Sequence, residues 1–405
     1  MTMLLNRRQA RERDGLEARS LRLAAQPGRA AATAAVSRPG AQLIIDPAVV
    51  GSNTRLLAGR TRGAVMAVVK ADGYGHGAEL VAAAALANGA SWLGVAGLPE
   101  ALALRSAGLR APVLSWLNPV DADFEAAAGL DVDVAVPSLE HLAAVAAAAA
   151  AGRRPAHVHL QADCGTAGDG APAWKWRELC ERAAALRREG LVTVAGVMGH
   201  LGCPDDPDDP AYARARARFC WAVRAARESG LRPAHRHLAA TAATLADPRP
   251  QQTMSRIGAG LVGIGAPGLR FAMTLRVPVI SVREAAAGTT VGYQPAWRAT
   301  RTTRLAVLGA GYADGIPRTI ADEAEIALNG ARCRVVGRVG MDQTVVDLGP
   351  AAARPGDQAT VFGPGEDGEP TPADWARWAG TVPHEIVTGI GPRVSRVQAP
   401  PARSS

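Results

Sequence analysis

Short apolar runs alternate with alanine-rich or amphipathic segments between residues 41 and 262, and this alternation constrains the fold more than any other feature. Runs of this length are typical of buried strands, and the segments between them have helical length. Repeated strand–helix units predict a parallel sheet, and about eight of them predict a (β/α)8 barrel. The runs predicted as strands are 43–45, 64–69, 92–95, 112–115, 132–136, 157–160, 192–198, 235–238 and 254–262.

The pattern changes after about residue 270. Apolar runs are now joined by turns rich in Gly, Pro and Asp, with little helix between them, which predicts a β-rich second domain. We therefore divide the chain into an arm at 1–40, a barrel at 41–270, a β-rich domain at 271–397 and a disordered tail at 398–405. The first strand, 43–45, pairs either within the barrel or with the second domain. Helices are expected at 47–58, 76–88, 99–107, 138–151 and 172–188.

Composition argues against several classes of protein. The net charge is +8, but no block of Lys and Arg with interleaved aromatics is present, which argues against nucleic-acid binding. No apolar run reaches the roughly 18 residues of a membrane span. The arm at 1–40 lacks an apolar stretch and reads as disordered or partly helical, not as a secretion signal. Five irregularly spaced cysteines fit reduced thiols in the cytoplasm and no metal site.

The segment Ala67-Val-Val-Lys-Ala-Asp-Gly-Tyr-Gly-His-Gly77 ends the strand at 64–69 with an unusual lysine. Lys70 and Lys175 are the only lysines among 45 Lys and Arg residues. A buried ammonium is costly unless it is paired, deprotonated or covalently used. Lys70 therefore either emerges into solvent where the strand ends or forms an imine, a reaction that arginine does not perform. The near-absence of other lysines favours chemistry at Lys70.

The same segment resembles the pyridoxal-phosphate lysine motif of the alanine racemase family, which reads close to V-K-A-N-A-Y-G-H-G. Further motifs follow in the family's order, so that the resemblance covers about residues 41–397. It implies a barrel followed by a β domain, pyridoxal 5′-phosphate as the cofactor, Lys70 as the lysine that holds it, and Tyr74 beside it.

Two more motifs imply the rest of the cofactor site. His200 follows the strand at 192–198, where barrel enzymes carry their chemistry; the resemblance places it against the cofactor ring, while a structural histidine is the plainer alternative. Gln252-Thr-Met-Ser-Arg-Ile-Gly-Ala-Gly-Leu261 resembles a family segment with M-V-R-x-G, and its glycine lets the N–H groups of Gly258 and Ala259 approach a phosphate. The segment from His237 resembles H-x-A-N-S-A-A, with Thr241 in place of a phosphate-binding serine at the start of a short helix.

The resemblance assigns the chemistry to three residues. Arg256 would face the pyridine nitrogen and, because arginine only donates hydrogen bonds, would keep that nitrogen unprotonated. Racemisation needs one group on each face of Cα, to take and to return the proton. Lys70 and Tyr293, in Thr-Val-Gly-Tyr-Gln-Pro, would be those two bases.

Two residues of the β domain are implied to contact the substrate. Tyr312 lies in Gly-Tyr-Ala-Asp-Gly, and Met341 lies in Val-Gly-Arg-Val-Gly-Met-Asp-Gln, where its N–H is available to a carboxylate. With Tyr293 they would complete the site of a partner subunit, so the resemblance implies a homodimer that acts on a small-molecule substrate, an amino acid.

Several positions depart from the family pattern. Gly168 replaces the arginine that holds the substrate carboxylate, and Gln161 replaces the lysine that positions that arginine. His384 stands in place of a phosphate-binding tyrosine, and Ala240 in place of an asparagine. Residues 203–210 form an acidic loop, which is either solvated or faces a cationic substrate.

The leading hypothesis is therefore a cytoplasmic, homodimeric, pyridoxal-phosphate-dependent amino-acid racemase or epimerase with Lys70 and Tyr293 as paired bases. Two alternatives stay open at this point. The first is a relative that catalyses another pyridoxal-phosphate reaction or uses another amino acid. The second is a non-catalytic protein that binds pyridoxal phosphate.

Overall fold

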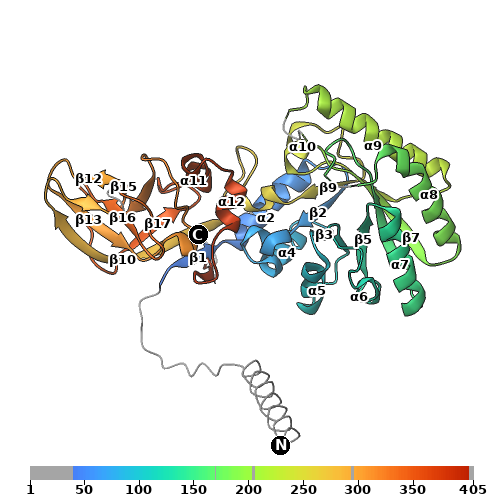
Figure 1. Ribbon diagram of the computed structural model, residues 1–405, viewed down its shortest axis with the longest axis horizontal. Helices are drawn as coiled ribbons and strands as arrows, with labels where there is room; N and C mark the ends of the chain where they lie inside the picture. The colour runs from blue at the N-terminus through green and yellow to red at the C-terminus, as the bar shows by residue number, and fades with distance from the viewer. Residues whose placement is uncertain (1–39, 169, 203–205, 293–295, 401–405) are drawn as a thin grey trace, which may run out of the picture. The chain divides into compact units, whose positions relative to one another are not determined.

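The computed structural model describes residues 40–168, 170–202, 206–292 and 296–400 (Figure 1). Tyr293, nearly all of the arm predicted at 1–40, and part of the acidic loop lie outside the described residues. Among those described, no helix combines the length and the apolar character that crossing a membrane requires.

Eight parallel strands form the predicted barrel, in the order β8-β7-β6-β5-β4-β3-β2-β9. The ring is closed between β8 and β9 by the Thr253 N–H, which donates to Arg236 O at 3.1 Å, and by a parallel bridge between Ala240 and Arg256. The (β/α)8 fold class is thus confirmed. The strands are β2 (Ala64–Val68), β3 (Trp92–Val95), β4 (Val113–Ser115), β5 (Val132–Val136), β6 (Ala156–Gln161), β7 (Val192–Met198), β8 (His235–His237) and β9 (Met254–Ile257).

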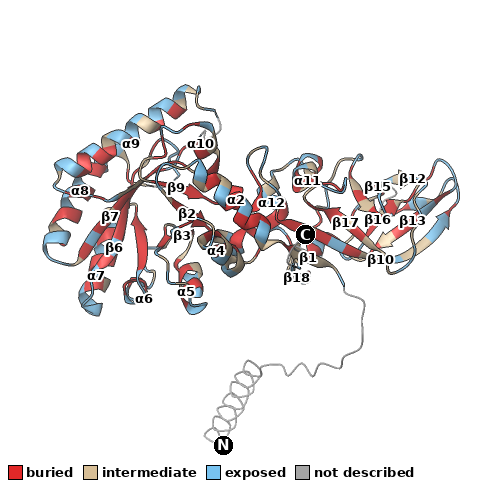
Figure 2. Cartoon of the chain, turned by 180° about the vertical axis from the view of Figure 1, so that it is seen from behind, coloured by how far each residue is buried: buried red, intermediate tan, exposed pale blue. Residues whose placement is uncertain are grey.

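Helices pack against the barrel strands through apolar faces (Figures 1 and 2). In α7 the buried residues Leu142, Val145, Ala146 and Ala149 are three or four positions apart, which places them on one side of the helix. Ser138 caps α7 by accepting a hydrogen bond from the His141 N–H. The helices are α2 (Pro47–Gly59), α3 (Lys70–Tyr74), α4 (Ala78–Leu86), α5 (Leu98–Ser106), α6 (Phe124–Gly129), α7 (Leu139–Gly152), α8 (Ala173–Arg188), α9 (Pro210–Glu228) and α10 (Thr241–Ala246).

Two predicted elements are shorter than expected, and glycine is the reason in both cases. The strand predicted at 254–262 ends at Ile257, because Gly258 turns the chain into the 3-10 helix η1 (Ala259–Val262). The helix predicted at 76–88 begins only at Ala78, because Gly75 and Gly77 have positive φ angles of 78° and 93°.

The first strand belongs to the β-rich domain. β1 (Gln42–Ile45) pairs antiparallel with β10 and parallel with β18, so the barrel consists of β2–β9 without it. The sheet order is β13-β16-β15-β14-β17-β10-β1-β18, with a further β13–β10 pairing. The elements of this domain are β10 (Met273–Ala285), β11 (Thr290–Val291), β12 (Trp297–Arg298), β13 (Thr303–Leu308), η2 (Tyr312–Asp314), β14 (Glu325–Leu328), β15 (Ala331–Val335), β16 (Thr344–Asp347), β17 (Gln358–Phe362), α11 (Pro372–Ala379), α12 (Pro383–Thr388) and β18 (Ser395–Gln398).

Candidate active site

Lys70 lies at the C-terminal edge of the barrel sheet, directly after β2. The preceding Val69 N–H donates to Gly94 O of β3 at 2.8 Å, which ties the end of the strand into the sheet. The carboxylate of Glu100 then ties the residue after Lys70 to the end of β3, because it accepts from the Ala71 N–H at 2.7 Å and the Ala96 N–H at 2.9 Å. Lys70 is therefore presented by a backbone that is fixed before and after it.

The residues after Lys70 form a left-handed turn. The φ angles of Ala71, Asp72, Gly73 and Tyr74 are 52°, 53°, 61° and 57°. An L-residue costs roughly 1–2 kcal/mol in this region, and only glycine enters it freely. Three of the four residues are not glycine, so the turn stores strain that its surroundings must hold. Strained backbone of this kind concentrates at functional sites.

The turn also packs closely against the β-rich domain. A Cβ atom on Gly75 would lie 2.4 Å from Val387 O of α12, so that only glycine fits there. The Arg396 Nε–H of β18 donates to Gly75 O at 3.2 Å. These contacts place His384 of α12 beside the barrel, with its ring 6.1 Å from the ring of Tyr74.

A small cradle of hydroxyl and amide groups lies next to Tyr74. A Cβ atom on Gly258 would lie 2.3 Å from Tyr74 Oη, so the absence of a side chain there makes room for the phenol. Thr241 Oγ1, at the start of α10, accepts from the N–H groups of Gly258 and Gly260 at 3.3 and 3.2 Å. Burial raises the pKa of Tyr74 to about 12, so its hydroxyl keeps its proton.

Arg256 lies almost fully buried at the end of β9 and is held by both of its Nη atoms. Nη1 donates to His237 O and Nη2 to Gly199 O, at 2.9 and 2.7 Å. Nη2 also approaches His200 Nδ1 at 3.3 Å. None of the hydrogen bonds between Arg256 and described residues uses its Nε–H, which remains available to a ligand. Burial lowers the pKa of Arg256 to about 10, and the side chain stays cationic at neutral pH.

His200 and His384 each lie within electrostatic range of Lys70. Burial, followed by the charges of Arg256 and Lys70, lowers the pKa of His200 to about 4. Burial and the charge of Lys70 also lower the pKa of His384. Both imidazoles are therefore neutral at pH 7. The structure thus brings together Lys70, Tyr74, His200, Thr241, Arg256, Gly258, Ala259 and His384, on six elements or their adjoining loops.

The two predicted substrate residues of the β-rich domain are not joined to this cluster. Tyr312 and Met341 are 39% and 54% exposed, and the Tyr312 N–H donates to Gly340 O at 2.9 Å. Within the described residues, neither side chain has a hydrogen bond or ring contact to a residue of the cluster. Tyr293, the predicted second base, lies outside the described residues.

Gly168 lies in an exposed loop after β6, whereas Gln161 is buried at the end of that strand. Asp163 shapes the loop, because its Oδ1 accepts from the N–H groups of Gly165 and Thr166 at 2.7 and 3.2 Å. Among the described residues, a Cβ atom on Gly168 would meet nothing closer than Thr166 Oγ1, at 3.9 Å. The loop therefore has room for a side chain at the position where the resemblance expects an arginine.

Sequence reasoning missed Glu100 and a row of buried groups beneath Arg256. Glu100 carries one usable signal, because an acid at the third position of a helix often caps the preceding loop. The row beneath Arg256 includes His159 and His237, which belong to two H-x-H patterns on strands. Alternation of this kind puts both histidines of a pair on one face.

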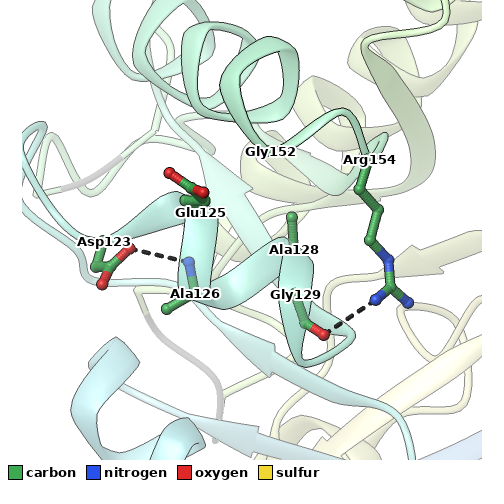
Figure 3. Close-up of a pocket in the computed structure, with 7 residues that line it drawn as sticks. All are labelled: Asp123, Glu125, Ala126, Ala128, Gly129, Gly152 and Arg154. Atoms are coloured by element: carbon green, nitrogen blue, oxygen red, sulfur yellow. Dashed lines mark hydrogen bonds between the residues drawn. The ribbon is translucent and has the colours of Figure 1, made fainter.

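A separate hollow of about 440 Å³ lies beside α6 and α7 (Figure 3). Arg154 Nη1 donates to Gly129 O at 3.0 Å across one side of it. The loops at Gly129 and Gly152 lead into the N-terminal ends of β5 and β6, whereas Lys70 follows the C-terminal end of β2. The hollow therefore takes no part in the site. The described residues hold no cluster of His, Cys, Asp and Glu suited to a metal ion.

Comparison with known proteins identifies the family. The family model for the alanine racemase N-terminal domain matches residues 45–266, and that for the C-terminal domain matches residues 272–398. The chain is 46% identical over 358 residues to an alanine racemase of Frankia casuarinae, covering 86% of this chain and 93% of that protein. The chain belongs to the alanine racemase family.

Solved structures of the family support the same assignment. The alanine racemase of Streptomyces lavendulae, a producer of D-cycloserine, superposes with a TM-score of 0.88 at 40% identity, covering 90% of this chain and 98% of that one. A more distant alanine racemase, from Bartonella henselae, was solved with covalently bound pyridoxal phosphate; its TM-score is 0.79 at 23% identity, covering 89% and 99% of the two chains. The alanine racemase family consists of pyridoxal-phosphate-dependent isomerases, so the predicted enzyme class is confirmed and the two alternatives are not favoured.

Proposed function

We propose that this alanine racemase family member binds pyridoxal phosphate through Lys70 and racemises a small amino acid, with alanine as the first candidate. One observation carries the proposal. Lys70, one of two lysines in the chain, lies on a strained turn within electrostatic range of two neutral imidazoles and beside a cradle of amide and hydroxyl groups. A phosphorylated aldehyde needs both an amine and such a cradle.

The residues present fit the cofactor. Gly258 lacks the Cβ atom that would collide with Tyr74 Oη, and its N–H donates to the Thr241 hydroxyl, so that both hydroxyl groups lie next to Gly258. Hydroxyl and backbone N–H groups of this kind bind phosphate. His384 lies beside the same phenol. The free Nε–H of Arg256 is the donor that would meet the ring nitrogen.

When bound, pyridoxal phosphate acidifies the Cα–H bond of an amino acid. The chain's own residues then direct the proton. Lys70 would take or return it on one face of Cα. Arg256 would donate to the ring nitrogen and, because it has no lone pair to accept with, would leave that nitrogen without a proton. An unprotonated ring would withdraw fewer electrons, which would favour return of the proton to Cα over other reactions of the cofactor.

The second base is Tyr293, which would act on the opposite face of Cα. We propose that it comes from the partner subunit of a homodimer, together with Tyr312 and the N–H of Met341. The exposure of Tyr312 and Met341 supports this, because large side chains left open next to each other are typical of a surface that a partner covers. Four free cysteines among the described residues support a cytoplasmic location.

The carboxylate pocket differs from the family pattern at Gly168 and Gln161. A pocket without its arginine holds alanine less tightly and discriminates less by charge. We therefore expect a high KM for alanine and a broader choice of amino acids.

The lysine assignment is tested by trapping. The full-length protein is loaded with pyridoxal phosphate, reduced with borohydride, digested and mapped by mass spectrometry. We expect the phosphopyridoxyl group on Lys70. Lys70→Ala should lose both the label and the yellow absorbance, whereas Lys175→Ala should keep both, because Lys175 is exposed and paired with Glu178 on α8. A label on Lys175, or none, would refute the proposal.

The reaction is tested by proton exchange. The enzyme is incubated in deuterated water with a panel of L- and D-amino acids, and deuterium at Cα and the enantiomer ratio are followed. We expect deuterium to enter alanine from both enantiomers together with racemisation. A cofactor-bound protein that exchanges no proton on any member of the panel would be a binding protein.

The shared site is tested by mixing two inactive variants. Lys70→Ala and Tyr293→Phe are each expected to lose racemisation. In a dimer that carries one of each, one of the two sites regains both bases, so that equal mixing and random exchange should restore about a quarter of the activity. No recovery in a mixture that ultracentrifugation shows to contain mixed dimers would place Tyr293 and Lys70 of one chain in the same site.

A further inference from the structure

The interior of the barrel contains a row of polar side chains beside a small apolar cluster that includes Met66 and Leu114. His159 of β6 and His237 of β8 are fully buried, and Asp133 of β5 is 4% exposed. Barrel interiors are normally filled by Val, Ile and Leu. Burying imidazoles and a carboxylate is costly unless each polar atom has a partner. Their placement therefore needs an explanation beyond packing.

These groups form one continuous chain of hydrogen bonds that ends at Arg256. Asp133 Oδ2 lies 3.1 Å from His159 Nε2, and His159 Nδ1 lies 2.8 Å from His237 Nε2. His237 Nδ1 then lies 2.9 Å from Arg256 Nη1. We call these four residues the histidine bridge. It connects the middle of the barrel with the arginine proposed to face the cofactor ring.

The direction of every hydrogen bond in the bridge is fixed by its two ends. Arg256 only donates, so His237 Nδ1 must accept and its proton sits on Nε2. That proton is donated to His159 Nδ1, which leaves the His159 proton on Nε2, where it is donated to the carboxylate of Asp133. Both histidines are thus neutral Nε2–H tautomers. Burial, reinforced by the charge of Arg256, holds the pKa of His237 well below its usual value, in agreement with a neutral ring.

Asp133 supplies the negative charge of the histidine bridge. No carboxylate among the described residues pairs directly with Arg256, although Arg256 is only 6% exposed. A buried guanidinium without a counter-ion is strongly unfavourable. Burial alone would raise the pKa of Asp133, but hydrogen bonds from His157 and His159 overcome this and lower it to about 2. The carboxylate is therefore ionised at every working pH.

The barrel makes space specifically for the bridge. A Cβ atom on Gly196 of β7 would lie 2.2 Å from His159 Nδ1, so any other residue would displace the ring. The pairing of β6 and β7 shifts register just before His159, which then faces Gly196. The ring of His235 stacks on that of His159 at 5.9 Å and closes the other side.

We infer that Asp133 is a positioning residue for the reaction: through His159 and His237 it fixes the orientation and the charge of Arg256. The expected effect of Asp133 on catalysis rests on the proposed function. The predicted tautomers of His159 and His237 do not depend on that function. Asp133, His159 and His237 need never touch the cofactor. They set where the guanidinium points and keep its donors aligned.

The first test is direct and needs no variant. Long-range ¹H–¹⁵N correlation spectra of the full-length, pyridoxal-phosphate-loaded protein report which ring nitrogen of each of the eight histidines carries the proton. We expect Nε2–H forms for His159 and His237, unchanged between pH 6 and 8. A proton on Nδ1 of His237, or a cationic His159, would overturn the inference even if the protein proves to be an active racemase.

The second test separates charge from direction. Asp133→Asn keeps a neutral acceptor for His159 but removes the charge, and should lower kcat about tenfold while KM for alanine stays within about twofold, since one charge-assisted contact is lost away from the substrate. Asp131→Asn is the matched control: the same change two residues away, on an exposed side chain paired with Arg154, should leave both constants unchanged.

Asp133→Ala also removes the acceptor, so that His159 should lose its single tautomer in the spectra. Gly196→Ala should do the same by displacing the ring. If either variant fails to fold, the inference is still tested by the wild-type spectra and by the kcat of Asp133→Asn. An Asp133→Asn variant with wild-type kcat would overturn the inference, and so would one in which kcat falls only as far as the folded fraction does. If no racemisation is found for any variant, the proposed function fails while the tautomer result stands by itself.

Discussion

Restoring an arginine at residue 168 is the sharpest test of how this chain holds its substrate. The position tolerates the change, because Gly168 is exposed and a Cβ atom there would have 3.9 Å of clearance to Thr166 Oγ1. Its φ angle is not in the left-handed region, so a side chain adds no backbone strain. Asp163 already holds the loop through the N–H groups of Gly165 and Thr166. Gly168→Arg should therefore fold as the parent does.

The expected gain follows from one new charge-assisted contact to the substrate carboxylate. Such a contact contributes about 1.5–3 kcal/mol, which corresponds to about 10- to 100-fold tighter binding. We expect KM for alanine to fall by that factor, with kcat much less changed. Propionate, which has the carboxylate but no amino group, should inhibit the variant more strongly by a similar factor. Initial rates at several propionate concentrations measure both quantities.

Gly168→Gln is the control, because it adds a polar side chain with an N–H donor but without the charge. It should leave KM and propionate inhibition near the parent values. Adding Gln161→Lys to Gly168→Arg should improve binding further, since the resemblance implies that this residue positions the arginine. Equal KM values for the Arg and Gln variants would show that the carboxylate is held elsewhere and would refute the reasoning.

Three further predictions follow from the geometry. Gly258→Ala should weaken pyridoxal-phosphate binding at least about tenfold, because the new methyl group would overlap Tyr74 Oη; fluorescence titration measures this, and unchanged affinity would contradict the cradle. Ala71→Gly should raise the free energy of unfolding by about 0.5–1 kcal/mol by relieving a left-handed L-residue, and a decrease in the urea midpoint would speak against stored strain. Acid should destabilise the fold between pH 6.5 and 4, because burial holds the pKa of His76 and His200 near 4 and the unfolded chain binds more protons in that window. A urea midpoint that stays constant over this range would exclude the effect, and His76→Gln should make the pH dependence shallower.

Much of the fold could be predicted from the sequence because its signals are local. Strand and helix lengths, the Gly and Pro turns after residue 270, and the lysine that follows an apolar run depend on neighbouring residues only. The helix that the resemblance implies at Thr241 likewise rests on a short motif, and α10 begins there. The strand predicted at 254–262 was too long, because the apolar pattern continues through the turn at Gly258.

Other features were out of reach because they join residues far apart in the chain. The sequence left open whether the first strand pairs in the barrel, and β1 joins the β-rich sheet because its partners are β10 and β18. The approach of His384 to Tyr74 likewise depends on how α12 packs against the turn at Gly75.

By itself, the sequence determined the barrel, the β-rich domain, the position of Lys70 and the resemblance that names its family, because periodicity and motif spacing are properties of short segments. Only the tertiary structure decided that Asp133, His159 and His237 form one hydrogen-bonded chain to Arg256. His159 and His237 are 78 residues apart, and they meet because closure of the barrel turns both side chains inward. The direction of that chain is a consequence of contact geometry, which no pattern of neighbouring residues contains.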